Sequence, residues 1–520
     1  MSHGRRLARH KRIHSFASRR LATVVISAAA LLVTSCGLVG NDDSVSQGTV
    51  SQDSEAGGQP STTITGSTTS TAARSETSST QPPSPQAGGE SIGDPLFPGL
   101  GNTGYQVDHY DLELNVTGAD LRAEADIRII PDVPLTSFNL DLVGMTVDRV
   151  LVNGIEASIE RDGRELIVHP ATTVQQDQPS QVRVLYHGVP QPIDDPSGPI
   201  ELGWHTEPWG TFVASEPLGA ATWFPANDHQ QDKATFRMEI TVPAGQTAAG
   251  PGLLVSELST SPSTSTFVWE MDEPMAPYLA SVVTGDFTIS TAVGIDGVVL
   301  RNVLPADQTT QLLPALASTN EMLAEFSQLF GAYPYDSYGV VAVPEDLRFA
   351  LENQTLSLFD TNFLTLRRRT VENVLAHELA HQWFGNNVSP TTWDDIWLSE
   401  GFASWADHYW TELDGGLTFD DRAAIATQLN LGPPTDVESD SLFSDSVYLR
   451  GALTLEALRR TTGNDEFFTI LETWGARFGG GTASTDDFLD LVRQHSGTEA
   501  ESVVRSFLFD PFMPQLPVNP

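Results

Sequence analysis

The chain contains little cysteine, little lysine and few long apolar runs, and each of these features excludes some classes of protein. Its single cysteine, Cys36, excludes an intrachain disulfide framework and a zinc cluster built from thiolates. Lysine occurs only as Lys11 and Lys233, and 28 basic residues stand against 67 acidic ones, for a formal net charge of −39. A surface this acidic repels nucleic acid and anionic lipid headgroups, so we predict no nucleic-acid partner.

The first 35 residues are predicted to be an export signal. An arginine-rich stretch leads into "LATVVISAAALLV", an apolar run too short to span a bilayer comfortably. The run ends at "VTSC", which resembles the lipobox of bacterial lipoproteins and implies lipidation of Cys36. A plain secretory signal with an incidental cysteine is the alternative. The lipobox resemblance implies an exported protein that is anchored by lipid to the outer face of the bacterial cell membrane.

Composition and periodicity divide the rest of the chain into three parts. Residues 36–97 are rich in Ser, Thr, Gly, Pro and Gln and cannot bury enough apolar surface to fold, so we predict a flexible tether. Residues 98–290 alternate apolar and polar positions, as in "YDLELNV", and predict a β-saddle or β-sandwich domain. Residues 291–520 show helical periods around a short sheet, so the predicted class is multidomain α+β.

The segment "VLAHELAHQWFGN" suggests a metal site. His377 and His381 are four residues apart, so a helix presents both imidazoles on one face, where they can bind one ion. Imidazole suits zinc, and Glu378 is placed to take a proton from a water molecule that the metal activates. The alternative is a helix whose histidines are satisfied in a core. Two imidazoles and a carboxylate so close together would need many polar partners there, which favours zinc.

A catalytic zinc ion needs a third protein ligand, and "TTWDDIWLSEGFASW" supplies a candidate. Thr392 and Asp395 have the spacing of a capping box, so we predict a helix that begins there and carries Glu400 about two turns in. The intervening "FGNNVSPTT" is rich in turn residues and allows this helix to fold back onto the first. The sequence therefore predicts one Zn²⁺ ion bound by His377, His381 and Glu400.

The stretch "HELAHQWFGNNVSPTTWDDIWLSEGFASW" resembles the zinc signature of the aminopeptidase N family, the gluzincin aminopeptidases related to leukotriene hydrolase. The family pattern is HExxH, eighteen residues and then Glu, and residues 382–399 are those eighteen here. Three further segments resemble the family: "ATWFPANDHQQDKATFRMEITVP", "FGAYPYDSYGVVAVPEDLRFALENQ" and "SVYLRGALTLEALR". The resemblance covers residues 105–518 and implies a thermolysin-like, mostly α-helical zinc peptidase domain after the β domain. It also implies a short family member that lacks the helical C-terminal domain.

The resemblance assigns catalytic roles to individual residues. It implies that His377, His381 and Glu400 are the zinc ligands. It also implies that Glu378 is the general base and that Tyr448 is the oxyanion donor. A phenol suits the last task because it stays protonated at neutral pH and can donate where negative charge develops. Without the family pattern, Tyr448 would be interpreted as a half-buried aromatic residue.

A second group of residues is implied to bind the substrate. Glu352 in "FALEN" matches the glutamate of the family motif G-x-M-E-N, which holds the α-ammonium group, and Ala350 and Asn353 flank it in the motif. Glu216 in "ASEPLGAATWFP" falls where the family has a Gln or Glu with the same task. From the residues alone, either carboxylate could instead be a solvated surface charge. Two carboxylates opposite a cation would bind an amino terminus and make the enzyme an exopeptidase.

The chain departs from the family pattern at several positions. Phe349 and Leu351 replace the usual Gly and Met of the motif, so we expect a reshaped or narrower first subsite. Arg450 stands where a lysine is common after the tyrosine, which keeps the charge. Lys233 in "DHQQDKATF" is predicted to be a structural ion-pair partner.

These features predict a zinc-dependent aminopeptidase that acts outside the cytoplasm on peptides with a free N-terminus. A thermolysin-type zinc endopeptidase shares the ligand pattern, but it would not present an ammonium-binding carboxylate at Glu352. An inactive surface-binding lipoprotein would have no need of the full set of ligands together with Glu378 and Tyr448. The sequence makes no prediction of the oligomeric state.

Overall fold

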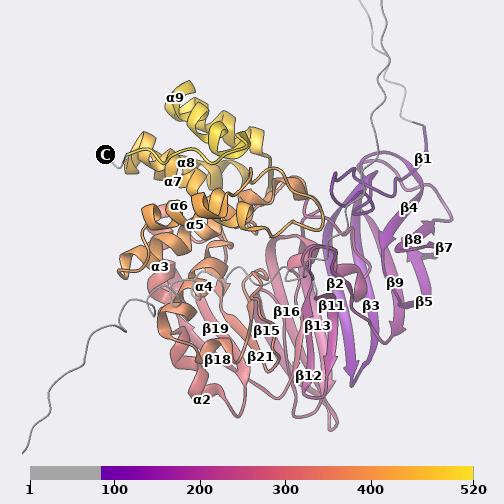
Figure 1. The fold of residues 1–520 in the computed structure, drawn as a ribbon. Coiled ribbons are helices and arrows are strands. Elements are labelled where there is room, and N and C mark those ends of the chain that lie inside the picture. The colour runs from indigo at the N-terminus through magenta and orange to yellow at the C-terminus, as the bar shows by residue number, and fades with distance from the viewer. Residues whose placement is uncertain (1–83, 199, 519–520) are drawn as a thin grey trace, which may run out of the picture. The chain divides into compact units, whose positions relative to one another are not determined.

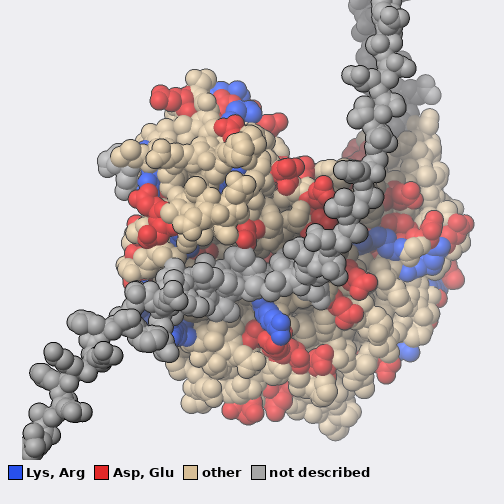
Figure 2. All heavy atoms as spheres, in the orientation of Figure 1, with Lys and Arg blue, Asp and Glu red and all other residues tan. Residues whose placement is uncertain are grey.

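The computed structural model of the protein describes residues 84–198 and 200–518 (Figure 1). The predicted export signal, Cys36 and most of the predicted tether lie outside the described residues, which belong to one compact unit from Pro85 onward. The chain is β-rich up to Pro305 and mostly helical after it. Within the described ranges, none of the helices combines the length and the apolar character needed to cross a bilayer. Figure 2 shows acidic side chains spread over the visible face, with fewer Lys and Arg between them.

The largest sheet forms the body of the β-rich part. The apolar alternation in the sequence places one face of each long strand in the core, and Tyr110, Leu112 and Leu114 are fully buried. Only one neighbouring pair, β2 with β13, is parallel. The eight strands pair in the order β15 (Leu253–Ser261), β16 (Thr264–Met275), β13 (Ala234–Pro243), β2 (Tyr105–Thr117), β3 (Asp120–Pro131), β9 (Ser180–Gly188), β5 (Thr146–Val152) and β6 (Ile155–Glu156).

Two smaller sheets complete the β-rich part. Four strands pair in the order β1 (Gln86–Ala87), β4 (Leu135–Asp141), β8 (Glu165–His169) and β7 (Ser158–Asp162). Five strands pair in the order β10 (Ile193–Asp194), β11 (Glu201–Glu207), β12 (Gly210–Ala214), β17 (Val283–Gly285) and β14 (Thr247–Ala249). The sheet that contains β12 matters for the site, because Glu216 follows the end of that strand.

The end of the predicted tether differs from the prediction. Strand β1 and the residues after it pack onto the folded body, although the tether was expected to continue to residue 97. The reason is Asp94, which is 1% exposed and accepts hydrogen bonds from the backbone N–H groups of Leu96 and Phe97 at 2.9 Å each. Its other oxygen pairs with His229 at 3.1 Å, so a short polar segment is fixed by buried hydrogen bonds.

The second part begins with a mixed sheet and continues with helices that gather on one side of the strands (Figure 1). The predicted domain boundary at residue 290 falls inside β18, the first strand of this sheet, whose hairpin partner is β19. The sheet contains β18 (Phe287–Val293), β19 (Val299–Pro305), β21 (Val340–Val343) and β22 (Ser357–Asp360), with β20 (Ser337–Tyr338) beside β19. The helices are α2 (Thr309–Leu312), α3 (Thr319–Phe330), α4 (Arg368–Ala380), α5 (Trp397–Leu413), α6 (Phe419–Leu429), α7 (Gly451–Thr462), α8 (Asn464–Phe478) and α9 (Thr485–Phe509).

Helix α5 begins differently from the prediction. The side chain of Thr392 makes no capping hydrogen bond, and a 3-10 turn from Trp393 to Asp395 precedes the helix, which starts at Trp397. The predicted capping box is therefore wrong, and Glu400 lies in the first turn of α5 rather than about two turns in. The physical reason is a competing partner, because the carboxylate of Asp395 accepts a hydrogen bond from the hydroxyl of Thr485.

Three side chains of the β-rich part hold the loop between α4 and α5. This loop connects the two helices on which the predicted metal ligands lie. The predicted ion pair of Lys233 is wrong, because its ammonium group donates to backbone carbonyls instead. The contacts join Lys233 to the carbonyls of Asn386 and Asn387 (2.8 and 3.0 Å), Gln231 to the carbonyl of Thr391 (2.7 Å), and Asp94 to the backbone N–H of Trp393 (2.9 Å).

Candidate active site

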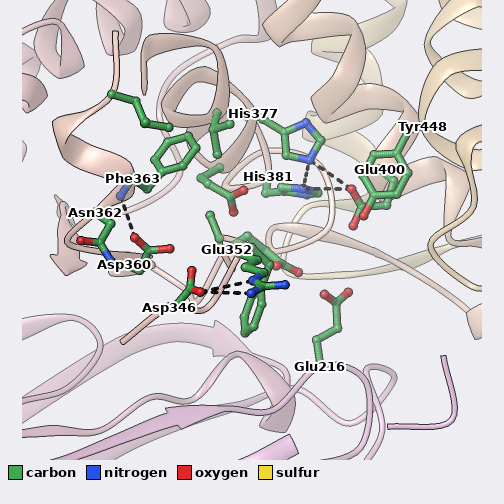
Figure 3. Close-up of a pocket in the computed structure, with 16 residues that line it drawn as sticks. Glu216, Asp346, Glu352, Asp360, Asn362, Phe363, His377, His381, Glu400 and Tyr448 are labelled. Atoms are coloured by element: carbon green, nitrogen blue, oxygen red, sulfur yellow. Dashed lines mark hydrogen bonds and ion pairs between the residues drawn. The ribbon is translucent and has the colours of Figure 1, made fainter. Parts of the chain in front are cut away.

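The two helices α4 and α5 pack together and bring the three predicted metal ligands to one point (Figure 3). His377 lies in the last turn of α4, and His381 is the residue that ends it. The Nε2 atom of His377 is 3.0 Å from Nε2 of His381 and 3.1 Å from Oε2 of Glu400. The distance from His381 Nε2 to the same carboxylate oxygen is 3.4 Å, and all three side chains are buried.

These separations fit a tetrahedral zinc ion. Ligand atoms at 2.0–2.1 Å from zinc, with tetrahedral angles between them, are separated by about 3.3 Å. Within the described part of the chain, His377, His381 and Glu400 are the one group of three or more metal-binding side chains with converging ligand atoms. Two imidazoles and one carboxylate leave a fourth position open, as catalytic zinc sites require.

Hydrogen bonds on the far side of each imidazole orient it toward the metal. Nδ1 of His377 donates to Oδ2 of Asp407 at 3.1 Å, and Nδ1 of His381 donates to the carbonyl of Phe384 at 3.1 Å. Both Nε2 atoms are therefore left to bind a cation. Asp407 was not predicted from the sequence, although its position seven residues after Glu400, on the same face of the helix, was a usable signal.

Glu378 lines the same cavity as the ligands and is 5% exposed. Burial raises the pKa of this carboxyl to about 8, while the neighbouring histidines act to lower it. The positive charge of a bound metal would also lower this pKa, which favours the ionised form that can accept a proton. Glu378 thus shares one cavity with His377, His381 and Glu400.

Tyr448 reaches the site from a single π-helical turn, Ser446–Arg450, which directly precedes α7. Its ring stacks near the imidazole of His377, with ring centroids 5.8 Å apart and an interplanar angle of 23°. Burial and the surrounding carboxylates raise the pKa of Tyr448 well above its usual value. The hydroxyl therefore remains a hydrogen-bond donor across the physiological pH range.

Glu216 and Glu352 face the same cavity from two different parts of the chain (Figure 3). Glu216 follows β12, and Glu352 lies between β21 and β22. Each is buried, and one oxygen of each carboxylate lacks a hydrogen-bond partner. Burial raises the pKa of both carboxyls, and the charge of Glu352 raises that of Glu216 further. Two buried carboxylates with no ion-pair partner among the described residues are suited to binding a cation from outside.

The cavity that these groups share has a volume of 440 Å³. Ala350 and Phe349 line it as well, so the position expected to hold Gly in the motif holds an aromatic ring at the cavity wall. Asn353 lines neither this cavity nor the smaller one beside it, and its predicted role in substrate binding stays a prediction. Tyr278 was not predicted from the sequence; burial raises its pKa, and the neighbouring carboxylate of Glu352 raises it further.

Comparison with known proteins identifies the family. The sequence model "Peptidase family M1 domain" matches residues 314–507. The aminopeptidase N of Acetobacter pasteurianus is 30% identical over 310 residues, which cover 56% of this chain and 84% of that protein. The chain belongs to peptidase family M1. Aminopeptidase M1-A of Oryza sativa subsp. japonica is 28% identical over 315 residues, and the M1 chain covers only 36% of the length of that plant relative.

Solved structures of family M1 confirm the predicted fold class. The M1 zinc metallopeptidase of Deinococcus radiodurans superimposes with a TM-score of 0.77 at 32% identity, covering 83% of this M1 chain and 100% of that one. A mutant of the same enzyme bound to a Tyr-Ser-Ala substrate matches equally well. Zinc is the cofactor that membership of family M1 implies, and the two imidazoles and the carboxylate of the site fit it.

Proposed function

We propose that this M1 chain is a zinc-dependent aminopeptidase that removes the first residue from peptides with a free N-terminus. The observation that carries the proposal is the pair of buried carboxylates, Glu216 and Glu352, each with one oxygen that lacks a hydrogen-bond partner, in the cavity of the metal ligands. An N-terminal ammonium group donates to both carboxylates and offsets their repulsion. A peptide that continued past this point would place a neutral amide there and leave two buried charges uncompensated.

The residues of the site divide the reaction among them. A bound zinc ion supplies a Lewis acid that polarises the scissile carbonyl and lowers the pKa of water. Glu378 accepts a proton from the attacking water and passes it to the leaving amine as the C–N bond breaks. The hydroxyl of Tyr448 donates to the carbonyl oxygen on which negative charge develops. Glu216 and Glu352 hold the ammonium group, so the first peptide bond lies beside Glu378.

Two other functions remain as outcomes of an experiment. A thermolysin-type endopeptidase would use the same zinc ligands and general base but would cleave peptides with blocked N-termini. An inactive binding lipoprotein would bind zinc without turnover. Neither accounts for two buried carboxylates in the cavity of the metal ligands, each with one oxygen that lacks a hydrogen-bond partner.

The proposal is tested with a panel of aminoacyl-anilides and their N-acetylated counterparts, hydrolysed by the zinc-loaded protein. We expect turnover of the free amines only, and a large rise in KM for Glu352→Gln, which keeps the shape of the side chain without its charge. Zinc content, measured by mass spectrometry, should stay the same in that variant. Equal hydrolysis of acetylated substrates would indicate the endopeptidase, and zinc binding without any turnover would indicate the binding protein.

We also propose that the protein is exported and anchored in the membrane by lipid on Cys36, a residue outside the described part of the chain. The support is the sequence alone: an arginine-rich start, a short apolar run and "VTSC" before the single cysteine. The full-length protein, expressed in a bacterium that processes lipoproteins, should partition into the detergent phase. Cys36→Ser should partition into the aqueous phase. Aqueous partition of the wild-type protein would overturn the proposal.

A further inference from the structure

The cleft has two arms that meet at the proposed ammonium site. Both are lined by Glu216, Phe349, Ala350 and Tyr448. The inner arm has a volume of 80 Å³ and walls that are mainly apolar, with room for one side chain and no more. The outer arm is the adjoining cavity of 440 Å³. The side chain of the first residue therefore fits the inner arm, and the rest of the peptide must leave through the outer arm.

Of the residues that line only the outer arm, Asp346, Asp360, Asn362 and Phe363 lie on the side of the close-up away from Tyr448 (Figure 3). The apolar walls of this arm suit the side chains that follow the scissile bond, and its rim carries charged groups. Apart from Glu352, Glu378 and the metal ligands, the residues that line only the outer arm are Asp346, Arg348, Asp360, Asn362, Phe363, Leu366 and Val374.

Arg348 is the one fixed positive charge among the described residues that line either arm. Its side chain is 77% exposed, and its Nε and Nη2 atoms both donate to a single oxygen of Asp346 at 3.3 Å. These bonds are long, and they leave other guanidinium donors free for a second carboxylate. A guanidinium binds a carboxylate through two parallel hydrogen bonds, and such pairs are among the stronger polar contacts in proteins.

The backbone of Arg348 is fixed in place. Its φ angle is +60°, a left-handed conformation that non-glycine residues rarely adopt. The carboxylate of Asp360, itself 4% exposed, accepts a hydrogen bond from the backbone N–H of Phe363 at 2.6 Å, and burial raises the pKa of this carboxyl while the nearby backbone N–H groups of Phe363 and Arg348 act to lower it. One buried side chain thus lies beside both sides of the outer arm, and rare backbone conformations such as that of Arg348 are frequent at functional sites.

The distance along the chain sets the length of peptide that would reach this arginine. Arg348 precedes Glu352 by four residues, which corresponds to at most about 14 Å of extended chain. Three extended residues of a peptide span about 10 Å, and the long arginine side chain can cover the difference. A tripeptide whose ammonium group lies at Glu352 therefore has its terminal carboxylate within reach of the guanidinium.

We propose that Arg348 binds the α-carboxylate of short substrates, so that the enzyme selects peptides of about three residues with a free C-terminus. This inference rests on the proposed aminopeptidase activity and names the class of substrate. Asp346 opposes the binding, because it occupies the guanidinium and repels an incoming carboxylate. The structure thus provides two neighbouring residues whose removal should act in opposite directions.

The test compares alanine peptides of two to five residues, each with a free C-terminal carboxylate or a C-terminal amide. The zinc-loaded full-length protein in detergent is used, and release of N-terminal alanine gives kcat/KM. We expect the acid to be preferred over the amide by roughly tenfold at three residues, chiefly through KM. The preference should be smaller at five residues and should fall at high salt, because the contact is exposed.

Two variants complete the test. Arg348→Met should abolish the preference for the acid, and Asp346→Asn should increase it several-fold. Each preference is the ratio of the kcat/KM values for two substrates on one protein sample. Partial unfolding of a variant lowers both values equally and leaves the ratio unchanged. Equal use of acid and amide by the wild-type enzyme, or an unchanged ratio in Arg348→Met, would overturn the inference. Absence of turnover of alanine anilide by the wild-type enzyme would instead overturn the proposed aminopeptidase.

Discussion

At the scale of single residues, Asp407 is the side chain on which the orientation of His377 depends. Besides accepting from that imidazole, it accepts hydrogen bonds from Asn373 at 2.7 Å and from Nδ1 of His408 at 2.8 Å. Asp407→Asn removes the charge that favours the donating Nδ1–H. We expect zinc affinity to fall roughly 10- to 100-fold, measured by competition with a chelator of known affinity. Asp414→Asn, an exposed carboxylate just after α5, is the matched control and should leave the affinity unchanged.

From the sequence, the positive charge of Arg450 was interpreted as its important property. In the structure, its side chain instead packs in the interior and caps a helix. It is fully buried and donates to backbone carbonyls at the C-terminal end of α9, where most carbonyls have no helical partner. These carbonyls belong to Ser506 (3.4 Å), Phe507 (2.7 Å) and Asp510 (2.5 Å).

We expect Arg450→Met to lower the free energy of unfolding by about 3 kcal/mol, because several buried carbonyls lose their donors at once. Arg450→Lys should lie between this variant and the wild type, since an ammonium group cannot reach carbonyls in several directions. Urea unfolding followed by circular dichroism measures the change. Arg493→Met, on the exposed face of α9, should change it by no more than about 0.5 kcal/mol. A loss as small for Arg450→Met would contradict the capping role.

At the scale of elements, two helices cross at a pair of glycines that lie next to catalytic groups. Gly401 in α5 follows Glu400, and Gly451 begins α7 shortly after Tyr448. A Cβ atom on Gly401 would lie 3.0 Å from the Cα atom of Gly451, closer than side chains normally approach backbone. The close contact therefore sets the distance between Glu400 and Tyr448, the proposed oxyanion donor.

Gly451→Ala should push the two helices apart and lower kcat by about tenfold or more, because a displacement of about 1 Å at a catalytic group can cost a hundredfold. We expect zinc content to remain near one per chain, since the ligands lie on α4 and α5. Gly475→Ala is the matched control, because its Cβ atom would meet no neighbour closer than 3.9 Å. That variant should keep full kcat and gain roughly 0.5–1 kcal/mol of stability. Full activity in Gly451→Ala would argue against this role.

Elements and ligands were predictable where a local pattern fixes them. The spacing of His377 and His381 requires only a helix, and the family pattern locates Glu400. The start of α5 was not predictable, because Asp395 prefers a hydroxyl from a distant helix to the local capping bond. Tyr278 was missed for the same reason, since only tertiary packing brings its hydroxyl to Glu352.

At the scale of the whole molecule, the β-rich part and the helical part depend on each other through the loop between α4 and α5. Lys233, the one lysine in the described part of the chain, donates to two carbonyls of that loop. Burial lowers the pKa of Lys233 to about 7, whereas a lysine in an unfolded chain titrates near 10.4. Between about pH 7 and pH 10 the unfolded chain therefore binds a proton that the folded chain releases, and this contribution to the free energy of unfolding rises with pH.

We expect Lys233→Met to be less stable than the wild type by a margin that widens from pH 7 to pH 9. The variant lacks both hydrogen bonds and the titration, while all other groups titrate equally in the two proteins. Urea unfolding at several pH values measures the margin, and zinc release by a chelator should be faster in the variant. A margin independent of pH would mean that Lys233 keeps its proton in the folded protein.

The two carboxylates proposed to hold the ammonium group belong to different halves of the chain, one after β12 and the other between β21 and β22. A bound N-terminus therefore acts as a non-covalent cross-link between the halves and relieves the repulsion between them. By thermodynamic linkage, the free energy that the bound amine adds to the association of the halves equals the free energy that this association adds to binding of the amine. Binding of the N-terminus and association of the two halves are thus coupled. Any change that weakens the association of the halves also lowers the affinity for the amino terminus.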